Sequence, residues 1–183
     1  YLIFALTSIV YLIFPKYSLS VDDIGTWANN TSMPDSNNIA SHFSLVYNNK
    51  LYVLGGANNS VGENGIYSAI GDDGQLSAWS EISSKPNQLW SAGANYDNKV
   101  YLLGGANSGV RNIADVKLGI ISPSGDINLW TDVTPLPNAL SLGGATIIGN
   151  RIYHVGGTTN GQNPNLATDD IWMAEIDNST GIL

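Results

Sequence analysis

The feature that most constrains this chain is a pattern that occurs three times with a period of about fifty residues. A short apolar run ending in two glycines appears as KLYVLGG, KVYLLGG and RIYHVGG, and the tyrosines in these runs lie 49 and 52 residues apart. A tryptophan recurs independently, at Trp27, Trp79 and Trp130, with steps of 52 and 51 residues. Two independent markers that share one period predict tandem supersecondary units that stack on one another.

The spacing of these markers also predicts the kind of unit. A period of about fifty residues is in the range of β-propeller blades. The structural markers within the repeats are Tyr52, Gly55, Gly56, Trp79, Tyr101, Gly104, Gly105, Trp130, Tyr153, Gly156 and Gly157. The composition agrees with an all-β fold, because 43% of the 183 residues are hydrophobic and twenty are glycines, which suit a core with many tight turns.

Each repeat contains short apolar segments separated by turns rich in Asn, Asp and Gly, which is typical of an antiparallel meander. In the middle repeat we expect strands at 92–96, 100–103, 115–121 and 127–133. The equivalent strands are expected at 43–47, 51–54, 66–70 and 76–82 in the first repeat, and at 144–148, 152–155 and 171–176 in the third. One such sheet cannot bury both of its faces alone, so the sheets are expected to stack, with the marker Tyr and Trp rings between them.

The order of these features resembles the kelch repeat. A first strand of small residues is followed by a Tyr, then Gly-Gly, and then an outer strand with a Trp before a Pro; these prolines are Pro34, Pro86 and Pro137. The resemblance covers about 21–183 and implies an all-β fold of kelch-type propeller blades, four-stranded antiparallel meanders, with about three blades present. The Arg that usually follows the Pro in kelch repeats does not occur here, and only His42 matches the His that often comes next.

The chain divides into an apolar segment at 1–20 and kelch-like repeats at 21–183, the latter at about 24–75, 76–126 and 127–183. Fourteen apolar residues at 1–14 are fewer than the roughly 20 needed to span a bilayer. They have the length of a signal-peptide core, so a signal or membrane anchor is one interpretation, and a blade strand at 9–14 is the other. With sequons at Asn29, Asn30, Asn58 and Asn178, the first interpretation predicts an extracellular or cell-surface protein.

Propellers typically need 4–8 blades, so three repeats are not expected to close alone. One explanation is that the chain is a piece of a longer protein with further blades. The other is that the strand of Trp27 completes the third blade, either within the chain or in a homodimer of two times three blades.

The sequence offers little for catalysis. It contains no cysteine, which excludes thiol chemistry and the Tyr–Cys copper site of the kelch-type galactose oxidase. Its two histidines are too few for a typical catalytic metal site, so no metal and no cofactor are expected. The turn Gly71-Asp72-Asp73-Gly74 is interpreted as a hairpin rather than a calcium loop. A net charge of −8, with basic residues scattered singly, argues against a nucleic-acid partner.

The loops that follow each Gly-Gly pair, and the segments before each first strand, are expected to lie on one face of the blades. They are rich in amides and low in charge, and amide groups both donate and accept hydrogen bonds. The candidate binding residues are His42, Asn58, Asn59, Trp90, Asn107, Arg111, Asn112, Asn160, Gln162 and Asn163. We expect a non-enzymatic module that binds a protein or a glycan; the alternatives are a mutarotase-like sugar enzyme and a structural part of an extracellular or membrane-associated assembly.

Overall fold

The computed structural model describes residues 27–34, 40–56, 65–160 and 164–183. These residues form eleven β-strands and one short 3-10 helix, η2 (Pro164–Leu166), and none of them lies in an α-helix. The strands are β1 (Phe43–Tyr47), β2 (Lys50–Leu54), β3 (Gly65–Ala69), β4 (Ser80–Glu81), β5 (Ala92–Tyr96), β6 (Lys99–Leu103), β7 (Val116–Ile121), β8 (Ile127–Val133), β9 (Gly144–Ile148), β10 (Arg151–Val155) and β11 (Ile171–Glu175). The predicted all-β class is confirmed.

The strands form three small antiparallel sheets, each a meander in chain order. The first sheet is β1-β2-β3-β4, the second is β5-β6-β7-β8, and the third is β9-β10-β11. Short turns join the first two strands of each sheet, so that Phe43 pairs with Leu54 and Ala92 with Leu103. Trp130 lies on β8, the last strand of the second sheet, and Trp79 lies immediately before β4, the last strand of the first sheet.

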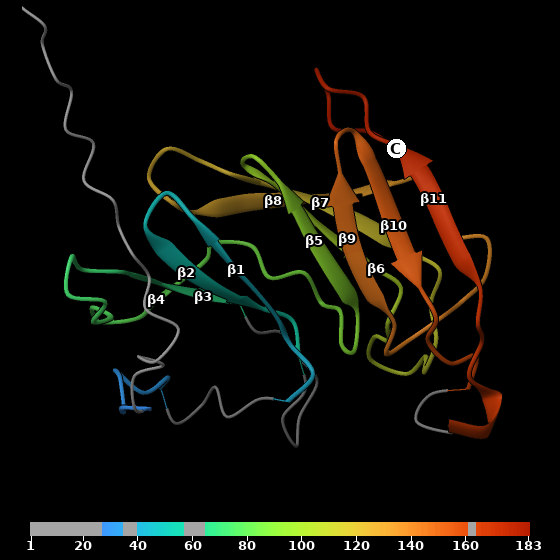
Figure 1. Ribbon diagram of the computed structural model, residues 1–183, viewed down its shortest axis with the longest axis horizontal. Helices are drawn as coiled ribbons and strands as arrows, with labels where there is room; N and C mark the ends of the chain where they lie inside the picture. Colours follow the sequence, from blue (N-terminus) through green and yellow to red (C-terminus); the bar gives the residue numbers. More distant parts are fainter. Residues whose placement is uncertain (1–26, 35–39, 57–64, 161–163) are drawn as a thin grey trace, which may run out of the picture.

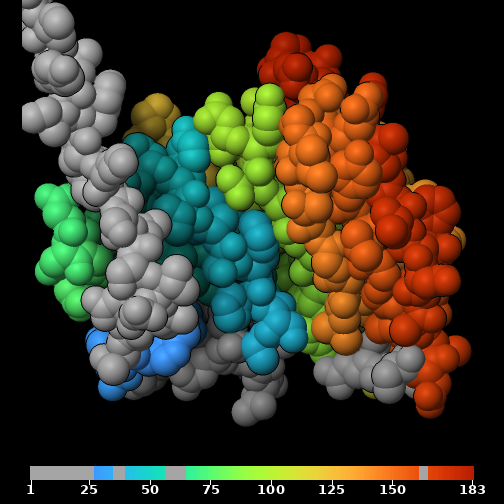
Figure 2. Space-filling model, viewed as in Figure 1, coloured from blue at the N-terminus to red at the C-terminus, as the bar shows by residue number. Residues whose placement is uncertain are grey.

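The three sheets are arranged side by side through their first strands. β5 lies between β1 and β9, and the row β1, β5, β9 runs across the molecule (Figure 1). The space-filling view shows the sheets as successive bands of the surface, coloured teal, yellow-green and orange (Figure 2). The last strands, β4, β8 and β11, lie at the opposite edges of their sheets.

The expected fourth strand of the first repeat, 76–82, is much shorter in the structure. Only Ser80–Glu81 forms regular strand pairs with β3. Upstream of it Ser77 keeps one backbone bond, from its amide to the Ala69 carbonyl at 3.0 Å, but its other bonds to this strand involve hydroxyls. The Oγ of Ser77 accepts from the Ala69 amide at 3.2 Å, and its backbone carbonyl accepts from the Ser68 hydroxyl at 2.8 Å. Side-chain hydroxyls that bond nearby backbone groups compete with regular strand pairing.

The second sheet is buried on both faces because its alternate side chains pack against the first sheet on one face and against the third sheet on the other. On β6, Val100 packs in a cluster with Leu45 and Leu54 of the first sheet. Its neighbour Tyr101 points to the other side and packs in a cluster with Ile152 of the third sheet. This alternation follows from the two-residue period of a strand, and it makes the second sheet the centre of the stack.

The marker tyrosines join each sheet to the next. Both Tyr52 and Tyr101 are fully buried. The hydroxyl of Tyr52 donates to the carbonyl of Gly125 at 2.9 Å, and that of Tyr101 donates to the carbonyl of Gly181 at 2.7 Å. Both glycines lie in the turn that follows the third strand of the next sheet. Burial raises the pKa of each tyrosine to about 12.

The marker tryptophans make the reverse connection, to the preceding repeat. The indole Nε1 of Trp130 donates to the carbonyl of Ser84 at 2.9 Å, and that of Trp79 donates to the carbonyl of Thr31 at 3.2 Å. Each acceptor follows the tryptophan of the preceding repeat by four or five residues. The marker tyrosines therefore connect consecutive sheets, and the marker tryptophans each bond the segment that follows the preceding marker tryptophan. In both cases the polar end of the aromatic side chain has a partner.

The third sheet has three strands, so β11 is an edge strand in the part of the chain that the structure describes. Of the strand expected around Trp27, only Trp27 itself is described, and it lies in irregular structure. The remainder of that strand and the alternatives for 1–20 fall outside the described residues. Within the described ranges no helix is long and apolar enough to cross a membrane.

Candidate functional site

The loops that carry the predicted binding residues meet at one end of the three sheets. In each sheet the start of the first strand pairs with the end of the second, as Phe43 does with Leu54 and Gly144 with Val155. The segments before the first strands and after the Gly-Gly turns therefore emerge together. We call the described part of this surface, residues 40–42, 88–91, 105–112, 140–143 and 157–160, the loop face.

The same backbone conformation recurs where each repeat enters its first strand. Ser41, Trp90 and Leu142 each lie two residues before that strand and have positive φ angles of 55°, 53° and 59°. Such a conformation is uncommon for residues other than glycine and is costly for bulky ones. Backbone strain of this kind persists where the surroundings impose it, and it is concentrated at functional sites.

Two of these entry residues are joined through their backbones on the loop face. The amide of Leu142 donates to the carbonyl of Trp90 at 2.8 Å, which joins the entries of the second and third sheets. Leu142 is exposed and Trp90 is half-buried. The loop face therefore carries an aromatic residue and an aliphatic residue whose backbones are hydrogen-bonded to each other, and Val110 is a further exposed apolar residue on it.

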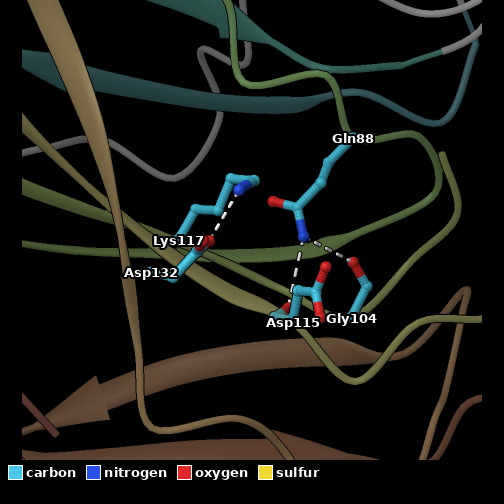
Figure 3. Close-up of polar contacts among 5 residues, drawn as sticks. All are labelled: Gln88, Gly104, Asp115, Lys117 and Asp132. Atoms are coloured by element: carbon cyan, nitrogen blue, oxygen red, sulfur yellow. Dashed lines mark hydrogen bonds and ion pairs between the residues drawn. The ribbon is translucent and has the colours of Figure 1, made fainter.

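A buried glutamine fixes the backbone next to the loop face through its side-chain hydrogen bonds. Gln88 is fully buried, and its Nε2 donates to the carbonyls of Gly104 at 3.1 Å and Asp115 at 3.2 Å (Figure 3). Ser91 donates its hydroxyl to the same Gly104 carbonyl at 2.9 Å. These bonds fix the Gly-Gly turn of the second repeat against the segment that leads into β7. Figure 3 also shows the ion pair of Lys117 with Asp132, 2.6 Å long, which joins β7 to β8.

The glycines of these turns are needed for close backbone approach. At Gly105, with φ of 97°, an added Cβ would lie 2.1 Å from the carbonyl oxygen of Leu89. Its amide donates to the carbonyl of Leu140 at 2.6 Å, so this turn touches the segments that precede both β5 and β9. The turn thus joins neighbouring loops, and glycine is needed at this position because a side chain would block the close approach of the two backbones.

The predicted binding residues differ in how they lie. His42, Arg111 and Asn160 are exposed, and Trp90 and Asn107 are half-buried. Arg111 forms no ion pair or hydrogen bond with another described residue, although the chain carries a net charge of −8, and its guanidinium is available to a ligand.

Asn112 has a different position from the other predicted residues. Its Nδ2 donates to the carbonyl of Thr158 at 2.6 Å and to the hydroxyl of Ser141 at 3.2 Å. Thr158 and Ser141 are both buried and pair with each other through their backbones. Asn112 therefore holds the loop of the second repeat against the loops of the third repeat. Its role is to fix the conformation of the loop face.

The other predicted residues, Asn58, Asn59, Gln162 and Asn163, lie outside the described residues. Sequence reasoning did not select Leu142, or the supporting residues Gln88 and Ser141. The alignment of the repeats contained one signal for Leu142, because it occupies the position of Trp90, which had been selected.

His154 lies beneath the loop face, between the second and third sheets, and its imidazole packs against the backbone of Gly143. Its side chain is 2% exposed, and burial lowers the pKa of the imidazole, which favours the neutral form. Neither ring nitrogen has a hydrogen-bond partner within the part of the chain that the structure describes. In the described residues no three His, Asp or Glu side chains are grouped so that they could hold a metal ion.

Comparison with known proteins adds no functional assignment. No protein-family model matches the chain, and no curated protein is found to be similar to it. The loop face is therefore interpreted from its own geometry.

Proposed function

We propose that this chain is a non-enzymatic binding module built from kelch-type propeller blades, and that it binds a protein or glycan outside the cytoplasm through the loop face. The blade interpretation is supported by the row of first strands β1, β5 and β9 and by the hydrogen bonds of the marker tyrosines and tryptophans between sheets. Propeller blades are four-stranded sheets arranged radially, with their loops on shared faces.

The observation that carries the binding proposal is the repeated left-handed entry at Ser41, Trp90 and Leu142. It puts Trp90 and Leu142 on the loop face, beside the Gly-Gly turn that buried Gln88 holds through the carbonyl of Gly104. Rigid aromatic side chains surrounded by hydrogen-bonding groups are the usual anchors of binding surfaces.

The surrounding groups favour a polar ligand with little charge. Asn107 and Asn160 offer amides that both donate and accept hydrogen bonds, and Arg111 adds one exposed cation that has no ion pair with a described residue. Sugar hydroxyls and peptide groups match such donors and acceptors, and either ligand can place an apolar face against an indole. A highly charged polyanion would meet only one Arg here and a chain of net charge −8.

The proposal is tested by probing the full chain on a glycan array and on a peptide array, followed by calorimetry on each hit. Trp90→Ala and Arg111→Ala should each weaken a true ligand about tenfold or more, as expected for central anchors. Arg151→Ala is the matched control, because Arg151 is also an exposed arginine but lies at the other end of the third sheet. Hits whose affinity is unchanged in both loop-face variants would contradict the proposal.

A further inference from the structure

A polar pocket lies at the end of the sheets opposite the loop face, where the first and second sheets meet. Its volume is about 430 Å³, within the range of about 300–1,000 Å³ that is typical of small-molecule sites. The turns after β1 and β5 and the turn after β7 form its walls. We call it the turn pocket, and its lining residues are Tyr47, Asn48, Asn98, Ile121, Ser122 and Pro123.

The lining of the turn pocket is polar without being charged. It combines an aromatic ring, two side-chain amides, a hydroxyl and a proline over the buried side chain of Ile121, and it includes no Asp, Glu, Lys, Arg or His. An ionic ligand would therefore lose its hydration here without gaining a partner of opposite charge. The lining favours an uncharged ligand with several hydrogen-bonding groups.

Three polar groups of the turn pocket are available to such a ligand. The hydroxyl of Tyr47 and the side-chain amide of Asn48 make no hydrogen bond to a described residue. Asn98 donates its Nδ2 to the carbonyl of Ile121 at 3.2 Å, which leaves its Oδ1 as an acceptor. The pocket therefore presents both donors and acceptors that are not used within the described structure.

These groups are held in place before a ligand binds. The ring of Tyr47 packs against the buried cluster that the first and second sheets share. Asn48 has a φ of 47° in the tight turn between β1 and β2, a conformation that asparagine tolerates. The amide of Ile121 donates to the carbonyl of Asn98 at 2.8 Å and fixes the opposite wall. A site with fixed side chains loses less conformational entropy when it binds.

The equivalent place between the second and third sheets differs in one contact. Tyr96 ends β5 as Tyr47 ends β1, and the Tyr96 hydroxyl donates to the Oδ1 of Asn178 at 3.5 Å. Asn178 and Pro123 are equivalent, because each lies two residues after the isoleucine whose amide bonds the first turn of its own sheet. Proline offers no polar side-chain group, so Tyr47 keeps its hydroxyl for the turn pocket.

We propose that the turn pocket binds a neutral saccharide unit. Sugar hydroxyls both donate and accept hydrogen bonds, as the free groups of Tyr47, Asn48 and Asn98 do, and the C–H face of a sugar ring packs on an aromatic ring. A peptide added as a strand uses a row of backbone partners, whereas the free groups here are side chains around one pocket. Because the pocket lies opposite the loop face, this proposal does not rest on the ligand proposed there.

Nuclear magnetic resonance of the full, ¹⁵N-labelled chain tests the proposal directly. The probes are the methyl glycosides of glucose, galactose, mannose and N-acetylglucosamine, each added up to about 100 mM because single sugars bind weakly. The side-chain NH₂ groups of Asn48 and Asn98 report from inside the turn pocket. We expect at least one sugar to shift both signals with a saturating dependence on concentration.

Three variants remove or occupy the free groups. Tyr47→Phe deletes only the hydroxyl, and Asn48→Gly deletes the amide while keeping a residue that adopts positive φ; each should weaken the sugar about fivefold or more. Pro123→Asn should weaken it as well, because it gives Tyr47 the partner that Tyr96 has in Asn178. Tyr96→Phe is the matched control and should leave the affinity unchanged.

The outcomes separate this site from the loop face. The proposal would be overturned if no sugar shifted the two amide signals, or if the affinity were the same in all three variants. A sugar whose binding is lost in Trp90→Ala but not in the turn-pocket variants would belong to the loop face, and this result would also overturn it. Short uncharged peptides that shift the same amides when no sugar does would show that the pocket binds a peptide instead.

Discussion

The hydrogen bond from Tyr101 to Gly181 gives the sharpest test of how the sheets are connected. Tyr101→Phe removes only the hydroxyl, so the ring continues to fill its space and leaves no cavity. The lost bond is 2.7 Å long and its acceptor, Gly181, is buried. A hydrogen bond of this kind contributes about 0.5–1.5 kcal/mol, and a buried carbonyl left without a partner costs about 1–3 kcal/mol. We expect the free energy of unfolding to fall by about 2 kcal/mol.

Urea denaturation followed by tryptophan fluorescence measures this change, and the variant should unfold at a lower urea concentration with an unchanged slope. Tyr52→Phe should behave in the same way, because Tyr52 makes the equivalent bond to Gly125. Tyr67→Phe is the matched control: Tyr67 stacks on Tyr52, but its hydroxyl has no hydrogen bond to a described residue, so its loss should cost less than about 0.5 kcal/mol. Equal effects of Tyr101→Phe and Tyr67→Phe would refute the reasoning.

Three further predictions follow from the titrating groups. Burial raises the pKa of Tyr52 and Tyr101 to about 12, so between pH 10 and 12 the unfolded state ionises first and stability should decline; absorbance near 295 nm should show both phenols titrating only on unfolding. Burial lowers the pKa of His154, so the free energy of unfolding should decline as the pH falls below about 6.5. His154→Leu should abolish that decline in urea titrations at pH 7 and 5, and an unchanged pH dependence would contradict this account. Hydrogen bonds from Ser179 and Thr180 lower the pKa of Asp177, so Asp177→Ala should speed hydrogen exchange of those two amides above pH 4, and exchange as slow as in the wild type would show that the carboxylate does not hold the turn.

The sequence predicts the elements well where the pattern is periodic. The strands at 43–47, 92–96, 127–133 and 144–148 occur with the expected bounds, because alternating apolar residues and Asn/Asp/Gly turns dictate both their faces and their ends. The buried positions of Tyr52 and Tyr101 are likewise confirmed. The repetition makes these positions predictable, because a residue that recurs at the same place in each repeat indicates a contact that each repeat makes.

The remainder depends on contacts between segments distant in sequence. The shortening of 76–82 arises from the Ser77 side chain, and a serine carries no signal of whether its hydroxyl will bond the backbone. The left-handed conformations of Trp90 and Leu142 oppose the intrinsic preference of those residues, so only the surrounding structure imposes them. Asn112 was selected as a polar loop residue, but its bond to Thr158 requires the third repeat to be in place.

The central claim is that the three repeats stack in order through their first strands, and a distance measurement tests it most directly. Because the chain has no cysteine, spin labels attach only at introduced ones, here Val46→Cys on β1 and Ile148→Cys on β9, both exposed sites. Pulsed electron paramagnetic resonance on the double variant, diluted with unlabelled protein, should give one narrow distribution near about 20–30 Å, which corresponds to two sheet spacings and the label arms. A broad distribution centred beyond about 40 Å would show that the sheets do not stack in this order and would contradict the account.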